Sequence, residues 1–401
     1  MSMKLAQRIT QIRPSATLTI NTKAQELRAA GRHIVSLAVG EPDFSTPDHV
    51  CAAAKAAVDQ GFTRYTPVPG IPELRAAVAG YFQDFYGVHA SMDNVVVTNG
   101  GKQSLYNLMQ VLLDPGDEVL VPAPYWVSYP ALVQLAQGQS VFVPTEPEAQ
   151  FLVTVEQLEA ARTARTRCLI LNTPSNPTGC HYSQSALDAL AAWAVEHNIF
   201  VISDEIYDRL VYAPAKPASL AAWWEKYPHG FAIVNGLAKS FAMTGWRVGY
   251  TLGHADLIKA MTKIQGQSTS NICSIAQKAA VAALTGGWEC LAPMLTAFAR
   301  RRDMALKLVL DWGRVQCPRP DGAFYLFPRV DAYYTPEVSD STALCAYLLD
   351  NANVALVPGA AFGDDRCIRI SYALDDATLA SCLPQIGQAL HALRPPCQEE
   401  S

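Results

Sequence analysis

The chain has 401 residues, half of them hydrophobic and 17% charged, and its formal net charge at pH 7 is -5. This length and apolar content suit one large domain or two ordinary domains with a sizeable core. The mild acidity argues against a broad basic surface for nucleic acid, and no apolar run approaches the roughly 18 residues that a membrane span needs.

The ten cysteines stand singly, without a Cys-x-x-Cys pair. Because zinc sites usually show such pairs, we expect no metal site. Several cysteines, such as Cys168, lie in apolar runs and are interpreted as small buried side chains in a reducing compartment. Residues 1–13 alternate between charged and apolar types and lack the apolar core of a signal peptide, so we expect a cytoplasmic protein.

The first part of the chain predicts a helix over residues 22–30, ended by Gly31, and a short strand over 33–38. A turn over residues 40–44 follows. Thr46 is expected to cap a helix that has Pro47 at its first position and runs to about residue 60. After a proline-stiffened loop over residues 65–70, Pro72 starts the next helix, which ends at Gly87.

From residue 94 to about 253, strands and helices alternate. Strands are predicted at 95–98, 118–121, 141–143, 167–171, 199–203, 231–234 and 247–252, and helices at 102–113, 126–136, 155–161 and 183–197. Several of these strands are almost wholly apolar, as expected when helices cover both faces of a sheet. The pattern predicts an α/β fold with a mostly parallel seven-stranded sheet between helices. Ligands of such sheets bind beyond the carboxyl ends of the strands.

Beyond residue 253, helices are predicted at about 254–265, 273–285 and 288–312, and the last carries residues 299–302 (Ala-Arg-Arg-Arg) on a solvated face. Short strands at 322–326, 354–357 and 368–372 precede a final helix from about residue 377. A break near residue 290 predicts two domains. The large domain comprises residues 46–290, and a smaller α/β domain combines residues 1–45 with 291–401.

One lysine lies in an unusual setting. Lys239 is surrounded in sequence by apolar residues that include Leu237, Phe241 and Met243. Lysine is almost never fully buried without a partner, and burial lowers its pKa and frees the amine as a nucleophile or base. We hypothesise that Lys239 forms a Schiff base with a carbonyl cofactor and that Arg247 holds a phosphate.

Three further segments place polar groups where predicted strands end. Gly100-Gly101-Lys102 opens a helix, where backbone N–H groups bind anions, although a tight turn is the plainer interpretation. Asp204 is either a helix cap or the partner of a protonated ring nitrogen, and Tyr207 could reach an oxygen of the same ligand. Asn176 projects from a proline-stiffened loop that could equally be an ordinary turn.

Two more residues complete the predicted site. Trp126 could stack on a planar ligand or pack in the core. Arg369 lies inside an apolar strand, where it captures a carboxylate or forms a buried structural ion pair. Together, these groups match the phosphate, aldehyde, ring nitrogen and 3-hydroxyl of pyridoxal phosphate. The sequence therefore predicts a site for this cofactor.

The sequence resembles the fold-type I, class I aminotransferases, most closely the bacterial aspartate and aspartate–prephenate aminotransferases. The resemblance covers nearly the whole chain. Its motifs are Val-Gly-Glu-Pro-Asp-Phe at 39–44, Gly-Gly-Lys-Gln at 100–103, Pro-Tyr-Trp-Val-Ser-Tyr-Pro at 124–130, Asn-Pro-Thr-Gly at 176–179, Ser-Asp-Glu-Ile-Tyr at 203–207 and the segment 235–250 around Lys239.

The resemblance implies ping-pong transamination between L-aspartate and 2-oxoglutarate, with prephenate as a further acceptor. Aromatic or alanine-like donors, or a β-lyase reaction on the same cofactor, are the alternatives. The amino acid and the 2-oxo acid are the expected small-molecule partners. The family further implies a homodimer with shared active sites, without a nucleic-acid or membrane partner.

The resemblance also assigns roles to residues of this chain. Lys239, Asp204 and Tyr207 are the expected catalytic residues. The expected cofactor-binding set adds Gly101, Lys102 and Arg247 at the phosphate, Trp126 on the ring, Asn176 at the 3-oxygen and Tyr65 at the phosphate of the neighbouring subunit. Arg369 is expected to bind the substrate α-carboxylate, with Gly40, Asn176 and Trp126 alongside, and Lys102 the side-chain carboxylate.

Overall fold

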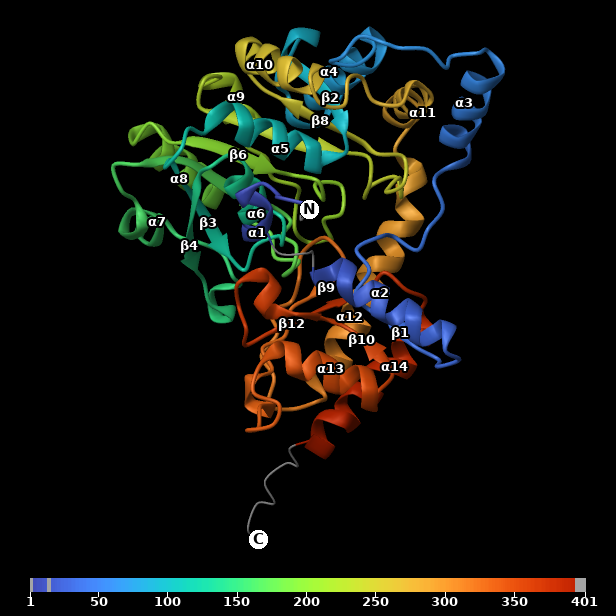
Figure 1. Cartoon of the computed structure of the whole chain (residues 1–401). Helices are drawn as coiled ribbons and strands as arrows, with labels where there is room; N and C mark the ends of the chain where they lie inside the picture. Colours follow the sequence, from blue (N-terminus) through green and yellow to red (C-terminus); the bar gives the residue numbers. More distant parts are fainter. Residues whose placement is uncertain (1–2, 13–15, 394–401) are drawn as a thin grey trace.

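The computed structural model describes residues 3–12 and 16–393, and its centre is a seven-stranded sheet (Figure 1). The strands follow the spatial order β2-β8-β7-β6-β5-β3-β4. They are β2 (Val95–Asn99), β3 (Glu118–Ala123), β4 (Gln139–Pro144), β5 (Thr166–Asn172), β6 (Phe200–Asp204), β7 (Phe231–Gly236) and β8 (Val248–Leu252). Within the sheet, β8 pairs antiparallel with both neighbours and the other pairings are parallel. The predicted mostly parallel sheet of seven strands is confirmed.

Side chains of the central strands are buried on both faces of the sheet. In β5, Cys168 and Ile170 pack with α5 (Gly101–Leu112), α6 (Tyr129–Leu135) and α10 (Ala255–Gly266). The alternate residues Leu169 and Leu171 pack on the opposite face with α4 (Pro72–Tyr86), α8 (Gln184–Glu196) and α11 (Ser274–Thr285). Successive strand residues point to opposite faces, so burial on both sides explains why these strands are almost wholly apolar.

The remaining helices of this part are α3 (Asp48–Asp59), α7 (Val155–Ala161) and α9 (Ala221–Lys226). The short helix α9 was not expected from the sequence. The expected cap of α3 is wrong, because α3 begins after Pro47 and has no side-chain cap. The Thr46 hydroxyl instead donates a hydrogen bond of 2.9 Å to the carbonyl of Ala242, beside Lys239. Short 3-10 helices lie at Met92–Asn94, Pro147–Ala149, Glu289–Leu291, Asp331–Tyr333 and Gly359–Phe362.

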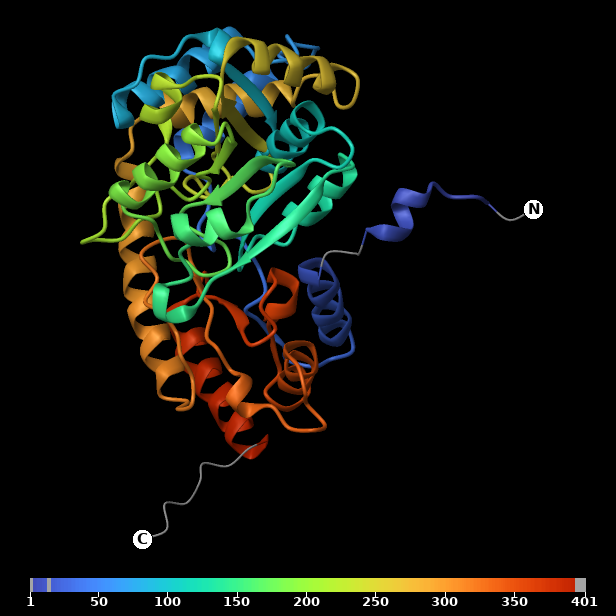
Figure 2. The ribbon, with the colours of Figure 1, turned by 90° about the vertical axis from the view of Figure 1, so that its left-hand side faces the viewer.

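The C-terminal third forms two small sheets, at the bottom of Figure 1. The first pairs β1 (Val35–Ser36) in parallel with β10 (Val354–Ala355). The second is antiparallel, with β11 (Val357–Pro358), β12 (Ile368–Ser371) and β9 (Tyr325–Leu326) in that order. The helices here are α2 (Ala16–Ala29), α13 (Ser341–Asn351) and α14 (Asp376–Leu393), while α1 (Gln7–Gln11) stands away from the body in Figure 2. The N-terminal strand thus joins the C-terminal third, and the domain boundary near residue 290 stays a prediction.

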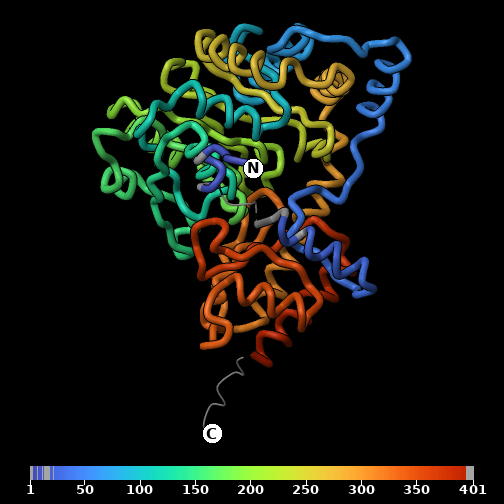
Figure 3. The backbone as a smooth tube through the Cα atoms, in the orientation of Figure 1, coloured from blue at the N-terminus to red at the C-terminus, as the bar shows by residue number. Residues whose placement is uncertain are grey.

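Two stretches of chain run between the part with the seven-stranded sheet and the part with the small sheets. One is the segment from β1 to α3, and the other is the long helix α12 (Ala292–Leu310), as the tube in Figure 3 shows. The expectation of a solvated face at residues 299–302 is confirmed for Arg300, whose side chain is 59% exposed, and is wrong for Arg301 and Arg302. Arg301 and Arg302 are only 6% and 2% exposed, because each pairs with a carboxylate and places its guanidinium over an aromatic ring, that of Phe44 for Arg301 and that of Tyr212 for Arg302.

Among the described residues, no single helix is long and apolar enough to cross a membrane. The helices Ser274–Thr285 and Glu289–Leu310 reach the length and apolar content of a membrane span only when they are counted together, and the chain bends by 95° between them.

Candidate active site

A cavity of about 410 Å³ lies beyond the carboxyl ends of the parallel strands β5 and β6. It gathers side chains from both ends of the chain, as expected for a ligand site at the carboxyl edge of an α/β sheet. The predicted site residues that line it are Gly40, Gly101, Lys102, Trp126, Asn176, Asp204, Tyr207, Lys239, Arg247 and Arg369. Tyr65 does not join this cavity, and its side chain is 92% exposed.

Lys239 lies in the turn after β7, and its Nζ donates a hydrogen bond of 2.6 Å to the carbonyl of Gly40. Burial lowers the pKa of Lys239 to about 8, against the opposing effect of the Glu41 carboxylate. An amine with this pKa is partly uncharged near neutral pH and can act as a nucleophile or a base. The geometry therefore gives Lys239 the properties that the sequence predicted.

An anion cradle lies where β2 meets α5. Gly100 has a φ of +80°, and a Cβ at this position would lie 2.3 Å from Nη2 of Arg247. Glycine thus lets the guanidinium of Arg247 approach the start of α5, where N–H groups point outward. Arg247 donates to the carbonyls of Thr244 and Asn99, at 2.9 and 3.2 Å. Its charge is balanced by no carboxylate among the described residues, which suits an anionic ligand.

Asp204 ends β6 and has a partner that the sequence did not reveal. The Tyr129 hydroxyl donates a hydrogen bond of 2.7 Å to Oδ2 of Asp204. Burial raises the pKa of Asp204 to about 6, while this hydrogen bond opposes the rise. Tyr129 is the first residue of α6, and Trp126 lies before the helix, so helical spacing does not link the two residues. Tyr129 falls within the motif at residues 124–130, but its neighbours in sequence do not indicate that its hydroxyl reaches Asp204.

We predict that Tyr129→Phe raises the pKa of Asp204 further, because the ionised carboxylate loses a donor. Asp204 would then ionise only at higher pH, and the acid limb of the kcat–pH profile should move to higher pH. Rate measurements across the pH range test this shift. Tyr125→Phe is the matched control, because the Tyr125 ring stacks on Phe142 instead, with centroids 4.9 Å apart. Identical acid limbs in the two variants would contradict the prediction.

Arg369 is a buried cation, 2% exposed, in the middle of β12. It donates to the side-chain oxygen of Asn176 at 3.0 Å and to the carbonyl of Ala38 at 2.6 Å. Its Nε has no hydrogen-bond partner, and no carboxylate of the described residues pairs with Arg369. The expected alternative of a structural ion pair is therefore not seen. A buried guanidinium with an unused N–H donor and no carboxylate partner fits a carboxylate ligand.

The aromatic side chains of Trp126, Tyr207 and Tyr325 also line the cavity. Lys102 Nζ lies 5.0 Å from the ring centroid of Trp126, and burial together with the charge of Arg247 lowers the pKa of Lys102. The Tyr207 hydroxyl lies 3.0 Å from the hydroxyl of Tyr325. Tyr325, in β9, was not predicted as a site residue, because nothing in its sequence context sets it apart from the apolar residues around it.

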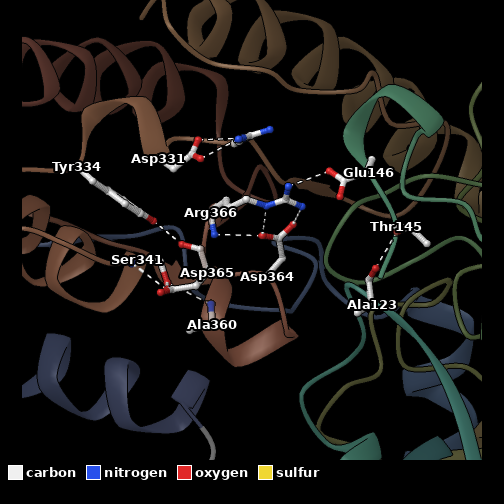
Figure 4. A network of polar contacts seen from close by, with 11 residues as sticks. Ala123, Thr145, Glu146, Asp331, Tyr334, Ser341, Ala360, Asp364, Asp365 and Arg366 are labelled. Atoms are coloured by element: carbon white, nitrogen blue, oxygen red, sulfur yellow. Dashed lines mark hydrogen bonds and ion pairs between the residues drawn. The ribbon is translucent and has the colours of Figure 1, made fainter. Parts of the chain in front are cut away.

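The network in Figure 4 centres on Arg366, which lies in the turn before β12. Arg366 pairs with Asp364 through Nε at 2.9 Å and with Glu146, which follows β4, through Nη1 at 2.8 Å (Figure 4). Asp365 accepts hydrogen bonds from the backbone and hydroxyl of Ser341, at 3.0 and 2.5 Å (Figure 4). Thus Arg369 lines the cavity, whereas Arg366 joins the edge of the large sheet to the C-terminal third.

The cavity residues fit pyridoxal phosphate. The cradle of Gly101 and Arg247 suits the phosphate, Lys239 suits the aldehyde, and the buried carboxylate of Asp204 suits a protonated ring nitrogen. In the part of the chain that the structure describes, no cluster of three or more His, Cys, Asp or Glu side chains could hold a metal ion.

Comparison with known proteins agrees with this chemistry. The model of the family "Aminotransferase class I and II" matches residues 32–386. An aspartate aminotransferase of Streptomyces avermitilis is 43% identical, over 96% of this chain and 96% of the relative. An aspartate/prephenate aminotransferase of Cereibacter sphaeroides is 44% identical, over 95% and 97%.

Solved structures agree as well. The aspartate aminotransferase of Thermus thermophilus with maleate superposes with a TM-score of 0.91 at 42% identity, covering 97% of this chain and 100% of that one. The enzyme of Rhizobium meliloti gives a TM-score of 0.93 at 39% identity, covering 97% and 99%. These superpositions confirm the predicted fold-type I architecture.

Proposed function

The chain belongs to the class I and II aminotransferases and uses pyridoxal phosphate, and we propose that it transfers the amino group of L-aspartate to 2-oxoglutarate. Prephenate is proposed as a further acceptor, in keeping with the relative from Cereibacter sphaeroides. The two half-reactions would use the same cavity in turn, by a ping-pong mechanism.

One observation carries the choice of a dicarboxylic substrate. Besides Arg247, which is assigned to the phosphate, two cations without a carboxylate partner among the described residues, Arg369 and Lys102, line the same cavity as Lys239. A dicarboxylic amino acid brings one carboxylate for each. An alanine-like donor would leave Lys102 only the phosphate that it shares with Arg247, so the half-buried ammonium would lack a carboxylate of its own.

We assign the site residues as follows. Bound pyridoxal phosphate supplies an aldehyde that captures the substrate amine and a ring that withdraws electrons from Cα. Arg369, with Asn176 and the backbone of Gly40, orients the α-carboxylate, and the free amine of Lys239 takes the proton from Cα. The remaining residues hold the cofactor: Asp204 the ring nitrogen, Tyr207 and Asn176 the 3-oxygen, Trp126 the ring face, and Gly101, Lys102 and Arg247 the phosphate.

A panel of amino donors with 2-oxoglutarate tests the proposed reaction. We expect the highest kcat/KM for aspartate and lower values for alanine, phenylalanine and tyrosine. Supplying prephenate with aspartate tests the second acceptor. A preference for an aromatic or alanine-like donor would overturn the choice of substrate, and release of pyruvate from a cysteine conjugate would favour a β-lyase.

Lys102 is the proposed determinant for the second carboxylate, so we predict a selective effect of Lys102→Met. Loss of one charge-assisted contact should raise KM for aspartate by roughly 10- to 100-fold, with a much smaller effect on alanine. Steady-state kinetics at saturating cofactor measure this difference. If Lys102→Met raises KM for alanine as much as KM for aspartate, Lys102 contacts only the cofactor phosphate and not the substrate.

A homodimer with shared sites is also proposed. The Tyr65 side chain is 92% exposed and lies outside the cavity of its own chain, which suits a residue that completes the phosphate site of a second copy. Large exposed aromatic side chains are typical of interfaces. Sedimentation equilibrium at assay concentrations distinguishes a dimer from a monomer, and an active monomer would overturn the proposal.

A cytoplasmic location is proposed from the state of the thiols. All nine cysteines that the structure describes are free, five of them buried. Free thiols in this number suit a reducing compartment. Fractionation of cells with an antibody to the protein tests the location.

A further inference from the structure

The segment of residues 38–44, termed the strap, accepts hydrogen bonds from both Arg369 and Lys239 in the cavity. Its carbonyl at Ala38 accepts from Arg369 at 2.6 Å, and its carbonyl at Gly40 accepts from Lys239 at 2.6 Å. Glu41 of the strap also lines the cavity. Two residues apart in sequence, these carbonyls set the positions of the two groups that meet the substrate.

The strap has little support along its own length. On its N-terminal side, Leu37 is fixed by backbone hydrogen bonds, to Ala355 at 2.9 Å and from Ser371 at 2.8 Å. From residue 38 to 45, no backbone-to-backbone hydrogen bond occurs among the residues that the structure describes. A segment without such bonds depends on its ends and on side chains for its position.

The C-terminal end of the strap is held by α12. Arg301 donates to Oδ1 of Asp43 at 2.7 Å and, through Nε, to Oδ1 of Asp376 at 3.0 Å. Its guanidinium carbon lies 5.4 Å from the ring of Phe44, which packs edge-on against Phe298 with centroids 5.6 Å apart. Arg301 is only 6% exposed, whereas the side chains of Asp43 and Asp376 are 29% and 38% exposed, so water screens these ion pairs somewhat less than it screens fully exposed pairs.

We propose that Arg301 is a positioning residue that fixes the strap and thereby holds the Ala38 and Gly40 carbonyls in place for substrate binding. The inference rests on the proposed function. It assigns a role in substrate recognition to a side chain that does not line the cavity. Without the Arg301–Asp43 pair, the strap must become ordered when the substrate arrives, and this ordering weakens binding.

Arg300 offers a matched control. It precedes Arg301 in α12 and binds the same Asp376, through Nε at 2.7 Å and Nη2 at 3.0 Å. Its side chain is 59% exposed, and it makes no described contact with Asp43. A role that merely joins α12 to α14 would therefore be shared by both arginines, whereas positioning of the strap belongs to Arg301 alone.

The experiment compares Arg301→Met, Arg300→Met and Asp43→Asn as full-length, cofactor-loaded enzymes. Steady-state kinetics give kcat and KM for the amino donor, calorimetry gives the Kd of succinate as an unreactive dicarboxylate, and thermal scans give Tm. We expect Arg301→Met and Asp43→Asn to raise both KM and the succinate Kd about tenfold, with kcat changed about threefold or less. Arg300→Met should leave KM and the succinate Kd within about twofold of wild type.

The double variant Arg301→Met/Asp43→Asn should bind succinate no more weakly than Arg301→Met alone, because both changes remove the same charge pair. If Arg301→Met fails to fold, Asp43→Asn carries the test, since Arg301 then keeps its bond to Asp376. Equal effects of Arg301→Met and Arg300→Met, or a lower Tm with unchanged succinate binding, would overturn the inference. A wild-type enzyme that does not transaminate would instead overturn the proposed function, and the succinate titrations would still report on the strap.

Discussion

Replacement of Lys239 with alanine is expected to lower kcat by about 10⁵-fold. This one side chain is proposed to supply both the amine that bonds to the cofactor and the base that moves the Cα proton, so its loss should remove two functions at once. Its position supports both roles, because burial lowers its pKa to about 8 and its Nζ points to the Gly40 carbonyl at the cavity wall.

The Lys239→Ala variant should still bind pyridoxal phosphate. Gly101 and the start of α5 lie on another segment, and Arg247, which shares the loop between β7 and β8 with Lys239, is held by the carbonyls of Thr244 and Asn99 and not by the lysine side chain. Absorbance of the protein after gel filtration measures the retained cofactor. As a control, Lys259→Ala removes a lysine that is 78% exposed on α10 and should leave kcat unchanged.

Chemical labelling gives an independent test of the same assignment. Borohydride reduction of the loaded wild-type enzyme, followed by peptide mapping, should fix the cofactor on the peptide that contains Lys239. Lys102 is the other lysine that the described residues bring to the cavity. A label on Lys102, or substantial turnover by Lys239→Ala, would contradict the assignment.

The sequence predicted most of the fold because the central strands carry an unambiguous pattern. In β5, Leu169 faces one side of the sheet and Ile170 the other, and both are apolar. Glycine, proline and cap residues separate the strands from the helices. Each polar residue that follows such a strand, including Asp204, must lie at the carboxyl edge of the sheet. The cavity could therefore be anticipated from the order of the elements.

What the sequence did not predict depends on contacts between distant segments. Arg301 and Arg302 sit in a run that is typical of a solvated helix face, yet Asp43, 258 positions away in sequence, covers Arg301. The hydroxyl of Tyr129 reaches Asp204 across 75 positions. Tertiary pairing of this kind leaves no local pattern, because neither partner's neighbours in sequence indicate it.

Replacement of Arg369 with methionine is expected to lower kcat/KM for aspartate by about 10³-fold. The guanidinium is the buried cation proposed to meet the α-carboxylate, and its Nε has no hydrogen-bond partner. Loss of a fully desolvated charge pair affects the transition state as well as the ground state, because the carboxylate orients Cα toward Lys239. Steady-state kinetics with aspartate measure the loss.

Stability should respond differently from activity, and this contrast separates the binding role of Arg369 from a structural one. Removing a buried cation that lacks a carboxylate partner stabilises the fold, while the Asn176 and Ala38 oxygens lose a donor, so the two effects offset to within about 2 kcal/mol. Urea unfolding of Arg369→Met measures the balance. The control is Arg366→Met, which breaks the pairs with Asp364 and Glu146 and should lower stability with little effect on kcat/KM. A large loss in the free energy of unfolding of Arg369→Met would instead show that the arginine stabilises β12. A side chain whose role is to bind substrate can be removed without such a loss of stability.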